Sequence, residues 1–582
     1  MLPAHLKRYV VEQDYGRYTA VDQEVWRYIM RQLSRFLGEH AHPCYLEGLK
    51  KTGIELDRIP NIAQMSSKLE KFGWQAIPVS GFIPPAAFME IQAHGYLPIA
   101  SDMRSVEHMA YTPAPDIVHE AAGHAPILVD PEFAGYLKSY AQIARKAIIS
   151  HEDLAQYEAI RILSDIKEDP SSTPEAIEAA NERLKAVNLA ISHISEAALL
   201  GRMNWWTAEY GLIGDMENPR IFGAGLLSSI GEARGCLKPQ VRKIALSIDC
   251  INFSYDITEP QPQLFVTPSF AHLTEVLNQL AKQMAFSNGG AAGLEKALAA
   301  KTVNTAQLNS GVQISGVLNE VVGDAASGPA YLRFSGPVQL SASGRELSGQ
   351  GRMQHPDGFG SPVGTIIGAS KCLSEMSESE LRHMHLRAGE IVDLRFTSGV
   401  IIKGQVTQLA FSEQKKLLVI SFKDCRVMRG EQLLFDPAWG SYDVAVGSKV
   451  ISVFGGPADR DAFGETGDFA AKVIPRKPWA PLVQLKHRLY GDVRRIREDL
   501  LAGRLSQASI ASSQLEKLLF ETESSFPNEW LLRLSLLELA QIVPSEDWQA
   551  RLREELAKIS GADPQVREQI SDGFNLLQTA PL

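Results

Sequence analysis

Two histidines five residues apart, His119 and His124, restrict the local fold of this chain more than any other feature. A regular helix turns about 100° per residue, so five residues separate the two rings by about 140°. Both rings can reach one metal ion only where the helix is distorted or ends between them. Gly123 and Pro126 permit such a distortion. The spacing alone equally allows two buried histidines that are hydrogen-bonded within a core segment.

A downstream carboxylate completes a candidate metal site. Glu209 lies in the run Trp205-Trp206-Thr207-Ala208-Glu209. Two imidazoles and one carboxylate on one side of a metal leave the other positions open, which is the arrangement of non-haem Fe(II) oxygenases. A zinc hydrolase of the HExxH kind needs its histidines four residues apart, and here Gly123 occupies that position.

Composition and charge restrict the kinds of partner and the cellular compartment that we expect for this chain. The chain has 582 residues, enough for several domains, and its 45% hydrophobic and 22% charged residues are typical of a soluble protein. The net charge of -10 argues against a nucleic-acid partner. No apolar run approaches the roughly 20 residues of a membrane span, so we expect no membrane partner. Scattered cysteines without CxxC spacing, and the lack of an apolar signal segment, predict a cytoplasmic protein with reduced thiols.

Five ordered segments resemble the pterin-dependent aromatic amino acid hydroxylases, a family that acts on phenylalanine, tyrosine or tryptophan. They are Val79–Phe88, Arg104 with Tyr111–Asp116, Trp205–Gly211, Phe222–Glu232 and Thr258–Pro262. The resemblance implies a mainly α catalytic domain of this type over residues 1–288. It also implies Fe(II) and tetrahydrobiopterin or a related tetrahydropterin as cofactors, with O2 as co-substrate.

The resemblance assigns roles at the metal and the pterin. It implies that iron is bound by His119, His124 and Glu209, and that Glu120 is a catalytic acid close to iron and pterin. It further implies that Phe88 stacks on the pterin ring, while the backbone near Gly81 and Ile83 touches the polar edge of that ring.

The resemblance also assigns a substrate pocket. Arg104, with Thr112 and Ser228, is expected to bind the carboxylate of an aromatic amino acid, since a guanidinium grips a carboxylate through two parallel hydrogen bonds. Trp205 and Pro115 are expected to wall the aromatic ring. Taken alone, Arg104 is more typical of a surface ion pair and Trp205 of a core residue.

The position before the Thr-Glu pair bears on the choice of substrate. The tyrosine-specific branch of the family carries an acidic residue there, and the matching residue is Ile257. An apolar group fits phenylalanine, so the resemblance implies a phenylalanine 4-monooxygenase that forms tyrosine. Asp256 is one residue away, and a register shift of one would reverse this interpretation. The alternative is a hydroxylase of tryptophan or another aromatic substrate.

Two segments depart from the family pattern. Residues near 150–200 are predicted to form an inserted helical pair, with Thr173 as the N-cap and Pro174 as the first residue of the second helix. The glycine-rich run 287–293 is predicted to be a linker.

The second half is predicted to form a small all-β domain over residues 300–465 and an α-helical region over residues 478–582. Val392, Leu394 and Phe396 alternate with polar residues before a glycine turn, as in a β-hairpin. His383-Met384-His385 could place two imidazoles on one strand face, and we assign it no metal. This half is interpreted as a regulatory or interaction module, with the C-terminal helices as a candidate surface for self-association or for a protein partner.

Overall fold

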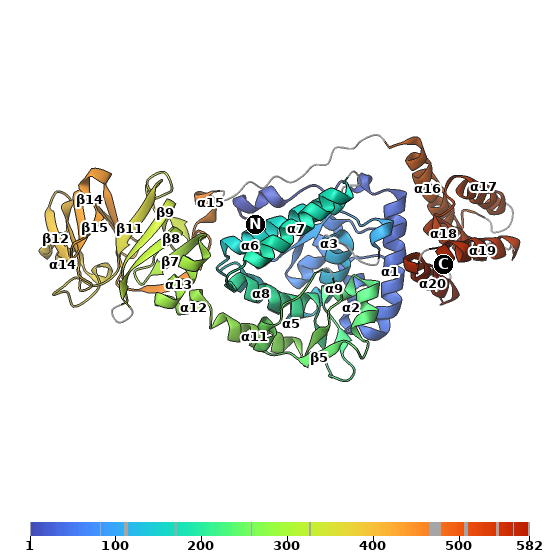
Figure 1. Cartoon of the computed structure of the whole chain (residues 1–582), viewed down its shortest axis with the longest axis horizontal. Helices are drawn as coiled ribbons and strands as arrows, with labels where there is room; N and C mark the ends of the chain where they lie inside the picture. The colour runs from blue at the N-terminus through green and yellow to red at the C-terminus, as the bar shows by residue number, and fades with distance from the viewer. Residues whose placement is uncertain are drawn as a thin grey trace.

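The computed structural model describes residues 2–81, 83–109, 115–168, 172–257, 259–324, 328–464, 479–505, 510–542, 546–562 and 564–579. Figure 1 shows three parts along the long axis: a β-rich part at one end, a helical body in the middle and the C-terminal helices at the other end. The chain is therefore a multidomain protein of helices and sheets. Across the described ranges, no helix has both the length and the apolar character needed to cross a lipid bilayer.

The middle body is mainly helical. Its helices are α1 (Ala20–His40), α2 (Cys44–Thr52), α3 (Ile62–Leu69), α4 (Pro85–Ala93), α5 (Pro131–Ala144), α6 (His151–Glu168), α7 (Pro174–Ala190), α8 (Glu196–Asn204), α9 (Ala224–Leu227), α10 (Ile230–Cys236) and α11 (Phe270–Ala281). Strands β1 (Gln75–Val79) and β2 (Tyr96–Ala100) pair in parallel, and β3 (Leu212–Ile213), β4 (Arg220–Ile221), β5 (Arg242–Ala245) and β6 (Gln263–Thr267) form a sheet of order β4-β3-β6-β5. The inward face of α1, including Trp26, Ile29 and Leu33, is buried in the apolar core of this body.

The helical pair expected near residues 150–200 is present as α6 and α7. The side-chain oxygen of Thr173 accepts a hydrogen bond from the backbone N–H of Ala176, and Pro174 occupies the first helical turn. Both features start α7 where the sequence predicts.

The β-rich part contains two sheets. The first has the order β10-β9-β8-β7-β17 with β11 paired to β9, and the second has the order β12-β13-β14-β15 with β16 paired to β14. Their bounds are β7 (Val303–Leu308), β8 (Val312–Asp324), β9 (Gly328–Ala342), β10 (Arg345–Glu346), β11 (Gly358–Pro362), β12 (Ile391–Arg395), β13 (Val400–Phe411), β14 (Leu417–Arg429), β15 (Gln432–Phe435), β16 (Tyr442–Ala445) and β17 (Val450–Gly455). The predicted hairpin is β12 and β13, joined through Gly399 at a φ of 83°.

Two sequence predictions in this half are wrong. The glycine-rich run 287–293 is not a linker, because it lies in helices α12 (Ala285–Asn288) and α13 (Gly290–Ala300). Gly289 adopts a φ of 54° between them, and Gly293 lets α13 pack closely on Val453 of β17. The His-Met-His run is not on a strand, because a capping box between Ser377 and Glu380 starts the short helix α14 (Glu378–His383).

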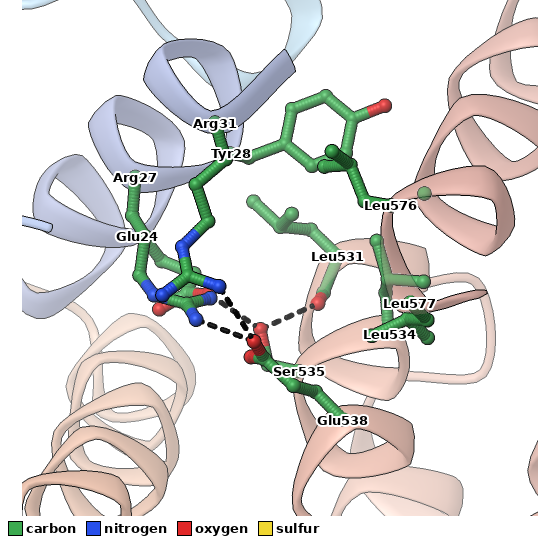
Figure 2. A pocket seen from close by; sticks show the side chains of 11 residues that line it. Glu24, Arg27, Tyr28, Arg31, Leu531, Leu534, Ser535, Glu538, Leu576 and Leu577 are labelled. Atoms are coloured by element: carbon green, nitrogen blue, oxygen red, sulfur yellow. Dashed lines mark hydrogen bonds and ion pairs between the residues drawn. The ribbon is translucent and has the colours of Figure 1, made fainter. Parts of the chain in front are cut away.

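The C-terminal helices pack on α1. They are α16 (Pro481–Leu501), α17 (Ile510–Ser525), α18 (Trp530–Ile542), α19 (Glu546–Ala562) and α20 (Pro564–Thr579). Tyr28 of α1 contacts Trp530 edge-to-face at 5.4 Å and donates a hydrogen bond to the carbonyl of Gln569 at 2.6 Å. Figure 2 shows leucines of α18 and α20 beside Tyr28 around a cavity of about 30 Å³, which is large enough for a single water molecule.

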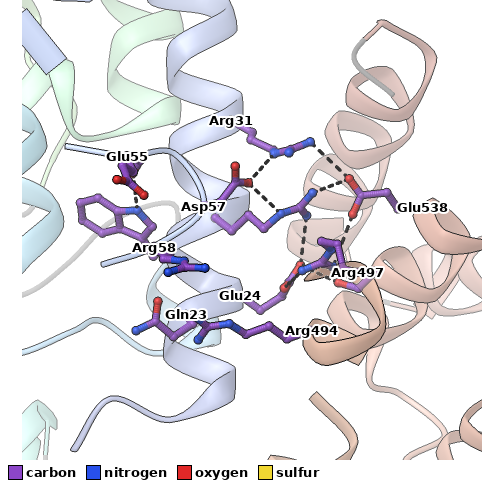
Figure 3. Close-up of polar contacts among 12 residues, drawn as sticks. Gln23, Glu24, Arg31, Glu55, Asp57, Arg58, Arg494, Arg497 and Glu538 are labelled. Atoms are coloured by element: carbon purple, nitrogen blue, oxygen red, sulfur yellow. Dashed lines mark hydrogen bonds and ion pairs between the residues drawn. The ribbon is translucent and has the colours of Figure 1, made fainter. Parts of the chain in front are cut away.

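A buried ionic cluster joins α1 to α16 and α18 (Figure 3). Arg27 contacts Glu538 at 2.5 Å and Glu24 at 3.3 Å, and Arg497 contacts Glu24 at 2.7 Å and Glu538 at 3.4 Å. All four side chains are at most 7% exposed. Burial alone would raise the pKa of Glu24, but the guanidinium groups of Arg497 and Arg27 outweigh it and hold the pKa at about 2. The carboxylate is therefore charged at neutral pH.

Candidate metal centre and active site

The five-residue spacing of the histidines is accommodated by a π-helical turn. Residues Val118–His124 form the π-helix η5, in which hydrogen bonds run over five residues and bring His119 and His124 onto one face. The predicted helix distortion is therefore present. Gly123 is required by packing, because a Cβ there would lie 2.6 Å from the carbonyl oxygen of Ala224 in α9. Pro126 lies in the first turn of the following 3-10 helix η6 (Ala125–Val129).

Glu209 meets both histidines. It is the last residue of a second π-helix, η7 (Trp205–Glu209). Its two carboxylate oxygens each lie 3.4 Å from an imidazole, one from Nε2 of His119 and the other from Nε2 of His124. The ligand atoms of His119, Glu120 and His124 also lie within 4.8 Å of one another. Imidazole nitrogens and carboxylate oxygens so arranged fit a divalent transition metal, including Fe(II).

The residues of the cluster differ in their protonation at neutral pH. Burial lowers the pKa of His124 to about 4, so its imidazole is neutral at pH 7. Burial would also lower the pKa of His119, but its hydrogen bond to Glu209 raises the pKa to about 9. Binding of a metal to His119 therefore releases a proton. Burial raises the pKa of Glu120 to about 8, so this group is protonated at neutral pH, and its buried Oε2 has no hydrogen-bond partner.

Ser228 fixes the orientation of His119. Its hydroxyl lies 3.0 Å from Nδ1 of His119 and donates to the carbonyl of Ala224 at 2.8 Å. Because the serine proton is directed to Ala224, the serine oxygen accepts the Nδ1 proton, which leaves Nε2 of His119 for a metal.

Arg104 is buried against a carboxylate of the protein itself. Its Nε and Nη2 contact the two oxygens of Asp116 at 2.6 and 2.7 Å, and its Nη1 donates to the carbonyl of Ser228 at 3.3 Å. Asp116 also accepts the backbone N–H of His119 at 3.0 Å. Sequence reasoning assigns no role to Asp116. An aspartate three residues before His119, at the start of a helix, is nevertheless a typical N-terminal capping signal.

Trp205 lies in a stack of three aromatic rings. Tyr255 lies nearly parallel to it at a centroid distance of 4.3 Å, and Tyr210 stacks on it at 4.6 Å with the ring planes inclined by 27°. The indole N–H donates to the side chain of Gln261 at 3.2 Å, and Gln261 donates in turn to the carbonyl of Asp256 at 2.8 Å. This network orders the loop that contains the half-buried Ile257. Tyr255 was missed from sequence because no local pattern distinguishes it.

The loop expected at the pterin is linked to the metal helix. Gly81 has a φ of 60°, and its N–H donates to the carboxylate of Asp102 at 3.3 Å. The carbonyl of Asp102 accepts the N–H of Ile117 at 2.8 Å, directly before η5. Ile83 belongs to a small apolar cluster around α4, and the partly buried Phe88 packs against this cluster.

The remaining predicted site residues are placed as follows. Pro115 is half-buried and directly precedes Asp116. Thr112, as well as Phe82 of the pterin-loop motif and Thr258 of the last motif, lies outside the described residues.

Known proteins are similar to the part of the chain that contains this cluster. Residues 10–154 and 185–288 match the family described as biopterin-dependent aromatic amino acid hydroxylase. A phenylalanine-4-hydroxylase of Mesorhizobium japonicum is 29% identical over 271 residues, which span 46% of this chain and 82% of that protein. A phenylalanine-4-hydroxylase of Chromobacterium violaceum is 28% identical over 268 residues, which span 46% of this chain and 75% of that protein.

One solved structure illustrates the same similarity. The crystal structure of Chromobacterium violaceum phenylalanine hydroxylase with bound iron(III) and 7,8-dihydrobiopterin is 26% identical, covers 49% of this chain and 88% of that chain, and gives a TM-score of 0.38. The family match confirms the resemblance inferred from the sequence motifs. Residues 10–154 and 185–288 are thus similar to the biopterin-dependent aromatic amino acid hydroxylase family.

Proposed function

We propose that this protein is a pterin-dependent non-haem iron monooxygenase that hydroxylates phenylalanine to tyrosine with O2. The observation that carries the proposal is the placement of both Glu209 oxygens 3.4 Å from the histidine nitrogens, within the part of the chain that matches the hydroxylase family. When bound, iron and a reduced pterin supply the O2 activation that this reaction needs.

The protein holds and orients the metal. His119, His124 and Glu209 bind Fe(II), and the hydroxyl of Ser228 accepts the Nδ1 proton of His119. Glu120 holds a proton at a buried carboxyl whose Oε2 lies 4.0 Å from Nε2 of His124. A neutral acid at this position adds no negative charge to the site and can supply the proton to a reacting group.

The proposed substrate contacts begin at Arg104, whose Nη1 donates to the carbonyl of Ser228, the residue whose hydroxyl contacts His119. Arg104, with Thr112 and Ser228, binds the amino acid carboxylate, and Asp116 keeps the guanidinium in place through its bidentate contact. Trp205 and Pro115 wall the aromatic ring and exclude water. Ile257 presents an apolar side chain, which favours phenylalanine because a phenol would leave a buried hydroxyl unpaired.

The loop that begins at Gly81 would hold the pterin. The backbone of Gly81 and Ile83 would bind the polar edge of the pterin, and Phe88 would stack on its ring. The left-handed φ of Gly81, with open space where a Cβ would project, supports close approach of a flat ligand to this backbone.

We also propose a division of the chain into three domains. The catalytic domain comprises residues 1–288, the β-rich domain 300–465 and the helical region 478–582. The chain resides in the cytoplasm, which the five unpaired cysteines support. The second half regulates the catalytic domain or binds a protein partner.

One turnover experiment tests the activity. The full chain is loaded with Fe(II) without oxygen and then given tetrahydrobiopterin, O2 and equal amounts of phenylalanine, tyrosine and tryptophan. We expect tyrosine to form from phenylalanine only when pterin is present, and the His119→Ala variant to form none. Hydroxylated tryptophan would favour the alternative substrate. No product from any of the three amino acids would contradict the proposed activity.

A further inference from the structure

A short helix, α15 (Arg460–Phe463), is firmly attached to the β-rich part. Gln339 of β9 donates to the carbonyl of Asp459 at 3.1 Å, and the carboxylate of Asp459 accepts the N–H of Glu346 at 2.9 Å. Phe463 is buried, and the guanidinium of Arg352 lies 4.8 Å from its ring centroid and donates to its carbonyl. The helix therefore moves with the β-rich part as one body.

This helix also contacts the catalytic half. Nη1 of Arg460 lies 2.8 Å from the carboxylate of Glu90 in α4, and Nη2 donates to the carbonyl of Arg145 at 2.8 Å. His5, in the N-terminal 3-10 helix η1 (Ala4–Tyr9), bridges Glu90 at 3.1 Å and Asp461 at 2.6 Å. We call His5, Glu90, Arg460 and Asp461 the α4 clasp. Figure 1 shows α15 beside the N-terminus.

The α4 clasp acts on a buried carboxylate. The side chain of Glu90 is only 4% exposed. Burial would raise its pKa, but the hydrogen bond from His5 and the charges of Arg460 and Arg145 outweigh burial and hold the pKa at about 2. Loss of Arg460 would leave the buried carboxylate of Glu90 with His5 and Arg145, at 3.1 and 3.9 Å, and we expect α4 to shift so that water reaches this weakened charge cluster.

Movement of α4 would displace Ile83, one of the residues proposed to bind the pterin. Helix α4 begins two residues after Ile83, and Ile83 packs with Ala87 and Ile91 of α4 in one apolar cluster. Leu6 of η1 belongs to the same cluster, directly beside His5 in the chain. The contacts thus run from α15, through the clasp, α4 and η1, to Ile83.

We infer that the α4 clasp positions the pterin-binding loop, so that the β-rich part sets the affinity of the enzyme for its pterin. Arg460 is a positioning residue in this inference, since it acts through Glu90 and α4. The inference rests on the proposed function, which places the pterin at this loop. Coupling between two sites is reciprocal, so pterin binding must also stabilise the contact of α15 with α4.

Binding measurements on the full, metal-loaded chain test the inference. Isothermal titration with 7,8-dihydrobiopterin is expected to show about 10-fold weaker binding for Arg460→Met than for the wild type. Arg460→Lys is expected to recover part of the affinity, because it retains the charge. Turnover should show a matching rise in KM for tetrahydrobiopterin, with KM for phenylalanine within about twofold of wild type.

The matched control is Arg333→Met. This arginine pairs with Glu320 at 2.6 Å within the β-rich part, and both side chains are more than one third exposed. We expect unchanged pterin affinity in this variant. Equal affinities of Arg460→Met and wild type would overturn the inference while leaving the proposed function intact. Failure of the wild type itself to bind dihydrobiopterin would contradict the proposed function and the clasp together.

Hydrogen exchange provides a readout that does not depend on turnover. In the wild type, dihydrobiopterin should slow amide exchange in residues 459–464 as well as in 83–93. In Arg460→Met the effect on 459–464 should disappear. If Arg460→Met does not fold, the same comparison uses Asp461→Asn, which removes the charge that pairs with His5. Protection of 83–93 alone in the wild type would show that the β-rich part is not coupled to the pterin and would refute the inference.

Discussion

The hydroxyl of Ser228 lies 3.0 Å from Nδ1 of His119, and its own proton is directed to the carbonyl of Ala224. This arrangement selects the imidazole tautomer that leaves Nε2 for iron. Substitution Ser228→Ala removes the acceptor, and we expect iron affinity to fall by about 10- to 100-fold. Metal titration monitored by calorimetry measures the change. Ser67→Ala, on an exposed turn of α3, is the control. Wild-type metal affinity in Ser228→Ala would refute this role.

The π-helical turn depends on the absence of a side chain at Gly123. In Gly123→Ala the new Cβ would meet the backbone of Ala224 at 2.6 Å, and backbone cannot move aside cheaply. We expect a loss of about 1–3 kcal/mol in the free energy of unfolding and a reduced iron content. Gly135→Ala is the control, because Gly135 is exposed in α5 and a Cβ there has no neighbour within 4 Å. Similar iron contents in the two variants would contradict this explanation.

The ring of Tyr255 covers Trp205 at a centroid distance of 4.3 Å. Tyr255→Ala removes the stack, which is worth about 0.5–1.5 kcal/mol, so we expect KM for phenylalanine to rise about 2- to 12-fold. Tyr255→Phe retains the ring and should leave KM close to the wild-type value. Steady-state kinetics with both variants separates the ring from the hydroxyl. Equal effects of the two substitutions would show that the hydroxyl, rather than stacking, matters.

The buried cluster around Glu24 predicts a pH-dependent attachment of the C-terminal helices. The pKa of Glu24 is lowered from 4.5 to about 2 in the folded chain, so its stabilisation is present above pH 4.5 and is lost as the pH falls toward 2. Limited proteolysis across this range should therefore release the C-terminal helices progressively. Glu24→Gln should show a weaker pH dependence between these limits. An identical pH profile in the variant would assign the transition to other carboxylates.

Breaking the same cluster at neutral pH has a larger effect. Arg497→Met leaves Glu24 without its closest partner, and removal of one member of a buried pair costs about 3–5 kcal/mol. We expect early proteolytic release of residues after about 480 and a lower thermal midpoint. Arg494→Met is the control, since Arg494 pairs at the surface with Glu498. Equal proteolysis of the two variants would argue against the cluster as the attachment point.

Sequence patterns predict those features of the fold that depend on neighbouring residues in the chain. The distortion between His119 and His124 follows from helix geometry and Gly123, and the start of α7 follows from Thr173 and Pro174. The run 287–293 was predicted incorrectly because glycine spacing looks the same in a flexible linker and at a tight helix–strand contact. Only the packing of Gly293 against Val453 distinguishes the two.

The residues that support the site depend on contacts over long stretches of sequence. Tyr255 stacks on a tryptophan 50 residues earlier in the chain, and Arg460 meets a glutamate 370 residues away. No periodicity or spacing rule can identify such partners in a single sequence. The sequence pattern indicated the proposed metal ligands because they lie in short conspicuous runs, whereas tertiary packing alone reveals the residues that hold them in place.

The cluster of Glu24 and Arg27 beneath the C-terminal helices has a consequence for where this protein can be divided. A family-sized fragment ending near residue 288 would have a natural boundary in sequence, but its first helix would present buried charges and Tyr28 to water. The catalytic half and the C-terminal helices share one apolar core. The part of the chain that matches the family and the part that packs around one core are therefore different, and the second includes residues after 480.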